Sequence, residues 1–146
     1  MNAKLTATQT TVIKAAAARP DGSIEPLQPS LRGGARTKVI DGLLARGLIA
    51  ESEGCHLLTD AGYAAAQAEL FLDELLRHGT TTALVFCTLH PESVEALFTE
   101  ALRLNMRLIA GKVMMDRHTP DYLSEDAKQS YRQTRALIQR WHHRGR

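Results

Sequence analysis

The sequence contains little cysteine and has only a small excess of positive over negative charge. Its 146 residues contain 18 Lys and Arg against 16 Asp and Glu, so the net charge is only +2. A strongly basic, histone-like nucleic-acid binder is therefore excluded, and the net charge does not indicate any class of partner. Two cysteines, Cys55 and Cys87, are too few for a disulfide scaffold or a four-cysteine zinc site. We interpret them as buried or free thiols in a reducing compartment.

Long apolar runs are also missing. The N-terminal segment MNAKLTATQT has no apolar core and no cleavage signal, and the longest apolar run, around Ala83 to Cys87, is too short to span a membrane. With 44% apolar and 23% charged residues, the composition is that of a folded protein with room for one ordinary domain or two very small ones. We therefore expect a soluble, cytoplasmic protein with no membrane partner.

The first half begins with a predicted helix over residues 8–19, in which apolar residues recur at helical spacing. Thr6 or Thr8 is its candidate N-cap, and Pro20 with the Asp-Gly that follows it ends the helix. A short extended piece and then a short helix near Pro29 are expected next.

A second helix and a hairpin follow. Gly33 and Gly34 predict a tight turn, and residues 35–46 predict a helix with Gly47 as its left-handed cap. Residues 48–58 predict two strands joined by a turn at Ser52-Glu53-Gly54, after which Thr59-Asp60 caps another helix. Helix, short helix, helix, hairpin, helix is the element order of a winged-helix domain.

The amino-acid sequence of residues 4–68 resembles that of a family of small bacterial winged-helix proteins. The segments that carry this resemblance include Leu5-Thr-Ala-Thr-Gln9, Ala15-Ala-Ala-Ala-Arg19, Leu31-Arg-Gly-Gly34, Leu43-Leu-Ala-Arg-Gly-Leu48 and Leu58-Thr-Asp-Ala-Gly62. The resemblance implies an N-terminal winged helix-turn-helix over residues 4–68, with residues 35–46 as its recognition helix.

Four residues are the candidate DNA contacts of such a domain. Arg36, Thr37 and Lys38 lie at the N-terminal end of the expected recognition helix, where such helices meet base edges, and Arg32 is placed to approach phosphate. The alternative is that these are solvated side chains on a helix used for packing or dimerisation, because the domain is neutral overall and a DNA-binding module usually carries a basic footprint.

The second half alternates helices and apolar strands. A helix is predicted over residues 60–78 with Gly79 as its stop, followed by a strand over 80–88 whose unbroken apolar run indicates that both faces are buried, as in a parallel sheet. Pro91 then begins a helix, and residues 107–115 predict a second strand. The expected core face of the helix after Pro91 is Val94, Leu97, Phe98, Ala101 and Leu102.

A last helix is expected to be capped by Ser124, with Glu125 and Asp126 in its first turn. Its expected buried face is Ala127, Tyr131, Thr134, Ile138 and Trp141. The order helix, strand, helix, strand, helix predicts one right-handed βαβ unit with flanking helices. The predicted fold class is therefore mixed α+β and α/β, in two domains, 4–68 and 69–146.

Residues 70–146 resemble an internal segment of bacterial guanine deaminases. The segments that carry the resemblance are the run from Phe71 to Phe86, His90-Pro-Glu-Ser93, Leu102-Arg-Leu-Asn-Met106, Gly111-Lys-Val-Met-Met-Asp-Arg117, Pro120-Asp-Tyr122, Ser130-Tyr131 and Ala136-Leu-Ile-Gln-Arg-Trp141. That family implies a (β/α)8 barrel of the amidohydrolase superfamily, which hydrolyses guanine to xanthine and ammonia at a zinc-bound water. The chain would then join a winged helix, through one long helix, to a βαβα fragment of this barrel.

The residues that the resemblance implies for catalysis have no counterpart here. The family's His-x-His is found nowhere in the sequence, and residues 70–146 cannot close a barrel that needs ~200 residues or more. We therefore expect a partial guanine deaminase-like protein that is inactive alone and holds no catalytic residue, zinc or other cofactor. The alternative function is a winged-helix, transcription-regulator-like DNA-binding module.

Two parallel strands leave open edges and apolar faces, so we expect a homodimer or docking onto a complete deaminase.

Other residues suggest chemistry more weakly. Cys87 and His90 have the spacing of two metal ligands, but catalytic zinc takes three protein ligands, so a metal site is not expected. Lys112 and Asp116 could form a catalytic pair, or Lys112 could pack in the barrel core. We favour packing. We expect half-buried packing for Cys55-His56, core or interface packing for Met114-Met115, and exposed helix-end positions for His142-His143.

Overall fold

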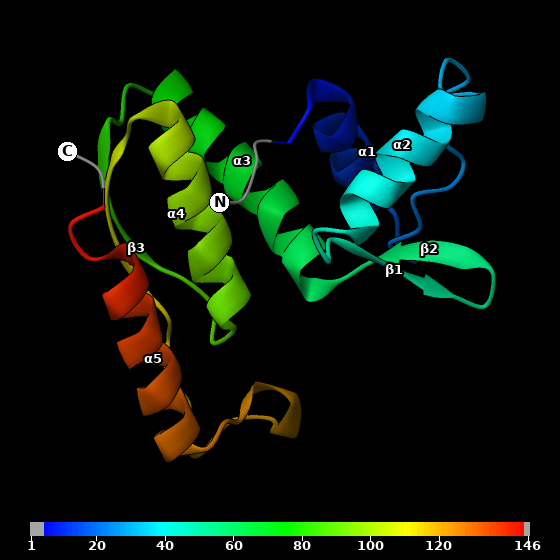
Figure 1. Cartoon of the computed structure of the whole chain (residues 1–146). Helices are drawn as coiled ribbons and strands as arrows, with labels where there is room; N and C mark the ends of the chain where they lie inside the picture. Colours follow the sequence, from blue (N-terminus) through cyan, green and yellow to red (C-terminus); the bar gives the residue numbers. More distant parts are fainter. Residues whose placement is uncertain (1–4, 145–146) are drawn as a thin grey trace. The chain divides into compact units, whose positions relative to one another are not determined.

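The structure, a computed structural model, describes residues 5–144, without the side chain of Tyr122. The chain separates into two compact units that divide between Gln67 and Ala68, inside α3. The described helices and strands, drawn in Figure 1, are α1 Ala7–Ala17, α2 Gly33–Leu44, β1 Ile49–Ser52, β2 Cys55–Leu58, α3 Asp60–Arg77, β3 Thr82–Phe86, α4 Pro91–Leu104, β4 Arg107–Gly111, the 3-10 helix η1 Asp121–Leu123 and α5 Ala127–Trp141. Within the described residues, no helix is long and apolar enough to cross a membrane.

The first helix of the first unit is confirmed, with Thr6 as its N-cap. The Thr6 hydroxyl accepts a hydrogen bond from the Gln9 N–H, and the Gln9 side chain accepts one from the Thr6 N–H. This reciprocal capping box satisfies two of the amide groups that a helix start leaves unpaired. It explains why the helix begins at Ala7, one residue earlier than the apolar spacing indicates.

The connection from α1 to α2 differs from the prediction in two places. The short helix expected near Pro29 is absent, because a single turn closed by the Leu31 N–H on the Gln28 carbonyl does not continue. The tight turn expected at Gly33-Gly34 is also wrong, since these residues form the first turn of α2. Gly33 has a φ of +53°, which lets the chain enter the helix at an angle that other residues rarely adopt.

The expected hairpin is confirmed in both strands and in its turn. β1 and β2 are antiparallel, with Ile49 opposite Leu58 and Ser52 opposite Cys55. Glu53 and Gly54 both have positive φ, as the favoured two-residue hairpin turns require. The Thr59 hydroxyl then accepts the Gly62 N–H and caps α3 as predicted.

The core of the first unit is formed by its helices and the hairpin. Its buried members are Val12, Ile13, Ala16, Ile24, Val39, Leu43, Ile49, Leu58 and Ala66. Ile24 belongs to an extended piece whose N–H donates to the His56 carbonyl, so β2 is paired on both sides. This third extended segment agrees with the short extended piece that the sequence predicts before α2.

The second unit contains the expected parallel strand pair. β3 and β4 run parallel with Thr82 opposite Arg107 and Phe86 opposite Gly111, and α4 connects them from Pro91 onward as predicted. The second strand is shorter than expected, ending at Gly111 instead of residue 115. The buried core is Ala68, Leu72, Leu97 and Ala101.

The prediction that both faces of β3 are buried is wrong. Val85 packs against the core of α3 and α4, whereas Leu84 and Phe86 on the opposite face are 68% and 82% exposed. Ile109 of β4 is 61% exposed on the same open face. The apolar run shows how much hydrophobic surface the strand carries, but within residues 5–144 only one layer of helices is present to cover it.

The last helix has a different N-cap from the expected one, and its expected buried face is confirmed only in part, because Thr134 and Trp141 are half-buried whereas Ala127 is exposed. Asp126, not Ser124, is the N-cap of α5, and its carboxylate accepts the Gln129 N–H at 2.8 Å. The buried positions are Ser130 and Leu137, so Tyr131 and Ile138 on the expected core face are more than half exposed.

Similarly, Leu102 of the expected α4 core face is 46% exposed, while Val94, Leu97 and Ala101 are buried as predicted.

Candidate functional site

The four candidate DNA contacts lie at and just before the first turns of α2, and all four residues are exposed. Arg36 forms an ion pair with Glu25, with Nη2 2.7 Å from Oε1. The Arg32 Nε donates to the Pro29 carbonyl at 2.9 Å, and the Thr37 hydroxyl donates to the Gly33 carbonyl at 3.4 Å. Lys38 forms neither an ion pair nor a hydrogen bond with any described residue, so it is the most available cation of the four.

The carboxyl ends of β3 and β4 are the second place where the sequence suggested chemistry. Cys87 follows β3, and burial raises the pKa of its thiol, which keeps the sulfur protonated. His90 is exposed and is the N-cap residue of α4. Both cysteines of the chain are free thiols, Cys55 exposed and Cys87 half-buried.

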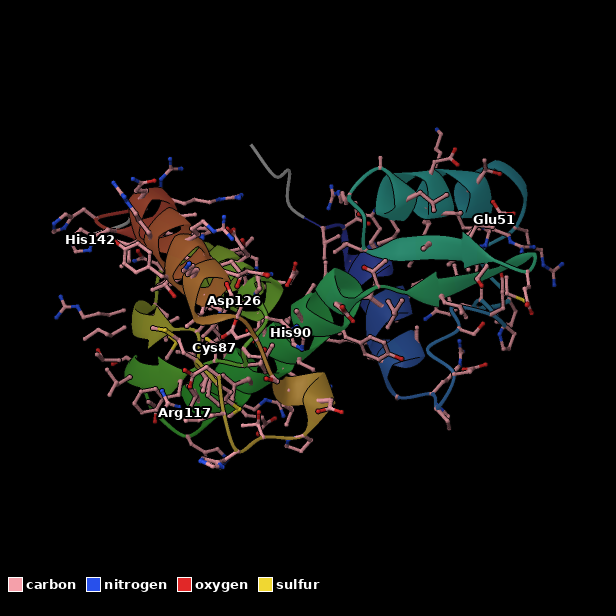
Figure 2. All side chains as sticks on the ribbon, turned by 90° about the horizontal axis from the view of Figure 1, so that it is seen from below. Glu51, Cys87, His90, Arg117, Asp126 and His142 are labelled. Atoms are coloured by element: carbon pink, nitrogen blue, oxygen red, sulfur yellow. The ribbon has the colours of Figure 1, made fainter. Side chains whose placement is uncertain are left out.

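These side chains do not form a metal site. Throughout the described part of the chain, no three His, Cys, Asp or Glu side chains are grouped so that they could hold a metal ion. Figure 2 shows the labelled His142 at the opposite end of α5 from Asp126 and away from Cys87 and His90. A catalytic zinc needs three protein ligands and an open position, so the residues present do not fit that group.

Lys112 is buried, in agreement with the packing role favoured from the sequence, but its partners are not the ones considered there. Its ammonium is buried and donates to both oxygens of Glu125, at 2.6 and 2.7 Å, and to the Ser130 hydroxyl at 3.0 Å. Asp116 instead pairs with Arg117. The catalytic Lys112–Asp116 pair is therefore wrong, and the lysine holds β4 to the start of α5.

Sequence reasoning missed the two partners of this lysine. Burial of the Glu125 carboxyl would raise its pKa, but hydrogen bonds from Lys112 and Ser130 outweigh it and hold that pKa below its ordinary value. A lysine inside an apolar strand was a usable signal, because a buried ammonium requires a carboxylate partner.

The end of α5 carries an aromatic cluster. Trp141 stacks on Phe98 of α4 with ring centroids 5.5 Å apart, and the His142 and His143 rings are 3.9 Å apart. Both histidines are exposed, as expected for helix-end residues. Cys55 and Met114 are exposed too, so half-buried packing of Cys55 and a core position for Met114 are wrong.

Comparison with known proteins identifies the class of this α/β chain. Residues 34–145 match the model of the amidohydrolase family, a match that begins within α2 and covers β3, β4 and all the helices after α2. The chain belongs to the amidohydrolase family.

The similar curated proteins are guanine deaminases. The guanine deaminase of Escherichia coli K12 is 59% identical over 87 residues, and the probable guanine deaminase of Deinococcus radiodurans is 42% identical over 89 residues. These matches cover 60% and 61% of this chain, and 20% of each relative. The chain thus spans about a fifth of the length of the curated relatives it matches.

Two solved structures agree with this assignment. The E. coli guanine deaminase superposes with a TM-score of 0.58 and 59% identity, covering 60% of this chain and 20% of that one. The guanine deaminase from Bradyrhizobium japonicum has a TM-score of 0.58 and 31% identity, covering 95% of this chain and 25% of that one. This chain is therefore homologous to guanine deaminases over at least the larger part of its length.

Proposed function

We propose that residues 68–146 form a guanine deaminase-like segment that supplies two parallel strands and their helices to a larger amidohydrolase architecture, and that the chain alone does not hydrolyse guanine. The open apolar face of the β3–β4 sheet carries this proposal. Leu84, Phe86 and Ile109 are 61–82% exposed there, although they stand on strands whose other face is packed by helices. Apolar surface of this kind normally belongs to the interior of a larger structure.

The chemistry of the available side chains supports the second part of the proposal. Hydrolysis at a metal-bound water needs a fixed set of ligands and an open coordination position. Cys87 and His90 offer two donors, of which the Cys87 thiol is held protonated by burial. Lys112 and Glu125 neutralise each other in an ion pair in which the lysine side chain is 0% and the glutamate side chain 8% exposed.

The test is an ammonia-release assay with the purified chain, guanine and added zinc. We expect a rate indistinguishable from a protein-free blank, with full-length E. coli guanine deaminase as the positive control in the same buffer. Zinc bound after dialysis, measured by atomic emission, is expected to be far below one ion per chain. Zinc-dependent ammonia release that grows with chain concentration would overturn the proposal.

A second candidate function is DNA binding by the first unit as a winged-helix-like module. The observation that favours it is the exposure of Arg32, Arg36, Thr37 and Lys38 together at the start of α2, followed by a two-stranded hairpin. Helices of DNA-binding modules present their N-terminal residues to the major groove in this way. Salt-dependent binding to a duplex would support this function, and its absence at low salt would exclude it.

A further inference from the structure

The positive charge of the chain is concentrated in α5 and the residues that follow it. Residues 127–146 contain six of the 18 Lys and Arg and none of the 16 Asp and Glu. The preceding 126 residues carry 12 basic and 16 acidic side chains, so the net charge of +2 conceals a basic segment on an otherwise acidic chain. A local excess of this kind, unlike the net charge, is the electrostatic footprint of an anionic partner.

The solvent side of α5 arranges part of this charge along one line. The residues of that line recur at the spacing of neighbours on one helix face. They are Tyr131, Arg132, Arg135, Gln139 and His142, which we call the α5 stripe. All five are exposed, whereas the buried residues of α5, Ser130 and Leu137, lie on the opposite side of the helix. The helical rise makes the stripe about 17 Å long.

The two arginines of the stripe are not used by the rest of the unit. No described residue forms an ion pair or a side-chain hydrogen bond with Arg132 or Arg135. Their guanidinium groups therefore keep all their N–H donors for a ligand, and the planar fork of each fits two phosphate oxygens at once. Lys128, one turn earlier, lies only two residues from the Asp126 carboxylate, which offsets its charge, and is not part of the stripe.

Tyr131 adds an aromatic surface beside these cations. It is 64% exposed and precedes Arg135 by four residues, so the two side chains are neighbours along the same side of the helix. Aromatic rings that stack on bases, next to cations that follow the backbone, are the features by which proteins bind single-stranded nucleic acid. In a duplex the bases remain stacked on one another, so the ring reaches them only after they are unstacked.

An anionic membrane is the other extended polyanion, and α5 does not fit it. A helix that lies on a membrane buries its apolar face among the lipids. In α5 that face is already occupied, because Leu137 is buried and the Trp141 ring stacks on Phe98 with the centroids 5.5 Å apart. The large apolar or aromatic side chains that α5 leaves exposed are only Tyr131 and Ile138. The charge and the aromatic ring therefore favour nucleic acid.

We propose that the α5 stripe binds single-stranded nucleic acid, with Arg132 and Arg135 on neighbouring phosphates and Tyr131 stacked on a base. Phosphate and stacking contacts tolerate any sequence, so binding is expected to show little sequence preference. The proposal goes beyond the proposed function and does not depend on it, because it involves neither guanine hydrolysis nor the residues at the start of α2.

The probe is a fluorescein-labelled oligothymidylate of about 15 nucleotides, in the range of known single-strand site sizes. The full chain is titrated into it at several salt concentrations between about 50 and 200 mM, and binding is followed by fluorescence anisotropy. We expect the double variant Arg132→Gln with Arg135→Gln to bind at least about tenfold more weakly than the wild type. The slope of log K against log salt should fall by about 1.4, because each single-strand phosphate contact contributes about 0.7.

The matched control removes the same amount of charge elsewhere in the unit. Arg77→Gln with Arg117→Gln replaces two exposed arginines that are already paired, with Glu74 and Asp116. This variant is expected to bind the oligonucleotide within about twofold of the wild type, because paired surface charges add little to phosphate binding. Circular dichroism of every variant checks that the fold is retained.

Two variants of one residue test the stacking contact. Tyr131→Leu removes the ring and is expected to weaken single-strand binding at least about fivefold, the lower end for the loss of one base–aromatic stack. Tyr131→Phe keeps the ring and should bind within about twofold of the wild type. On a duplex of the same length, Tyr131→Leu is expected to change the affinity by less than about twofold, because the bases stay stacked.

Three results would overturn the inference. The first is a wild type that does not bind the oligonucleotide at the lowest salt, including the case in which it sediments with phosphatidylserine-containing vesicles instead. The second is an equal loss in the stripe variant and its matched control, which would mean that only net charge matters. The third is single-strand binding that is lost in Lys38→Ala and retained in the stripe variant, which would place the site on α2. None of them depends on the ammonia-release assay.

Discussion

The ammonium of Lys112 lies 2.6 and 2.7 Å from the two carboxylate oxygens of Glu125, with both side chains almost fully buried. Ser130 joins the pair, accepting from Lys112 and donating to Glu125 at 2.9 Å. The contact connects the residue after β4 to the residues that begin α5. It is thus a polar clasp within the second unit rather than a reactive centre.

Removing one member of this clasp leaves a buried charge without its partner. We expect Lys112→Met to lower the free energy of unfolding by about 3–5 kcal/mol, the range for breaking buried ion pairs. Fluorescence of Trp141, the single tryptophan, reports unfolding of this unit in a urea titration. The control is Lys128→Met on the exposed side of α5, for which we expect a change below about 0.5 kcal/mol.

The double variant Lys112→Met with Glu125→Leu removes both charges of the ion pair. It therefore distinguishes the loss of the pair from the cost of leaving one buried charge without a partner. Replacing a whole buried pair by apolar residues is often close to neutral, so we expect most of the stability lost in Lys112→Met to return. If Lys112→Met alone costs less than about 1 kcal/mol, the clasp does not stabilise the unit.

The same clasp predicts the direction of a pH effect. The pKa of Glu125 is lower in the folded chain than its ordinary value, because the hydrogen bonds from Lys112 and Ser130 outweigh the opposing effect of burial. Its contribution to stability is therefore full above the unfolded pKa of about 4.3 and is lost as pH falls through the folded pKa. Lys112, Ser130 and the backbone of Met115 are the groups that act on this carboxyl.

The measurement compares wild type with the double variant in urea titrations from pH 8 to pH 3. We expect the difference in unfolding free energy between the two proteins to be constant down to about pH 5. Below that pH the wild type should lose stability relative to the double variant. A difference that stays flat to pH 3 would contradict the lowered pKa of Glu125.

Residues whose environment follows from local sequence were predicted well. The hairpin, the caps at Thr6 and Thr59 and the helix start at Pro91 depend on turn and capping chemistry within a few residues. The exposure of Phe86 could not be predicted, because hydrophobicity indicates that a side chain favours burial but does not show whether a second layer of helices covers that face of the sheet. Ser130 was missed because apolar periodicity cannot register a buried polar residue whose partner, Lys112, lies on another element.

Gly62 of the first unit tests the packing between α3 and the segment that enters β1. A Cβ at this position would lie 2.1 Å from the Leu48 carbonyl oxygen, so Gly62→Ala forces the backbone apart. We expect a loss of about 1–3 kcal/mol, measured as faster amide exchange across β1 and β2. Gly34→Ala is the control, because nothing lies within 4 Å of its Cβ position and alanine favours helix. Equal exchange rates in the two variants would contradict this steric account.

Phe86 tests whether the open sheet face promotes association. The residue is 82% exposed beside Leu84 and Ile109, an uncovered apolar surface that favours contact between molecules. We expect light scattering to show concentration-dependent association of the wild type and a reduced apparent mass for Phe86→Lys. The unfolding free energy should change by less than about 0.5 kcal/mol, because the ring makes little contact within the chain.

The buried Leu72→Lys is the matched control and is expected to unfold the second unit. A wild type that stays monomeric at high concentration would show that this face does not drive association.

The proposed DNA-binding role makes a prediction that separates the cations of α2 from one another. Lys38 is free of partners among the described residues, whereas Arg36 is partly neutralised by Glu25 at 2.7 Å. If the start of α2 contacts the duplex, removing the Lys38 cation is expected to weaken duplex binding and to reduce the slope of log K against log salt by about one. Glu25→Gln should have the opposite effect, because it releases Arg36 and removes a negative charge beside it.

Fluorescence anisotropy of a labelled duplex between about 50 and 200 mM salt measures both quantities, in a range where phosphate contacts change affinity strongly. Lys128→Ala, an exposed cation of the second unit, controls for net charge. A similar loss in Lys38→Ala and Lys128→Ala would mean that binding reflects overall charge and not α2. Binding that is weakened in Lys38→Ala, strengthened in Glu25→Gln and unchanged in Lys128→Ala requires that the start of α2 contacts the duplex, because only that surface distinguishes the three variants.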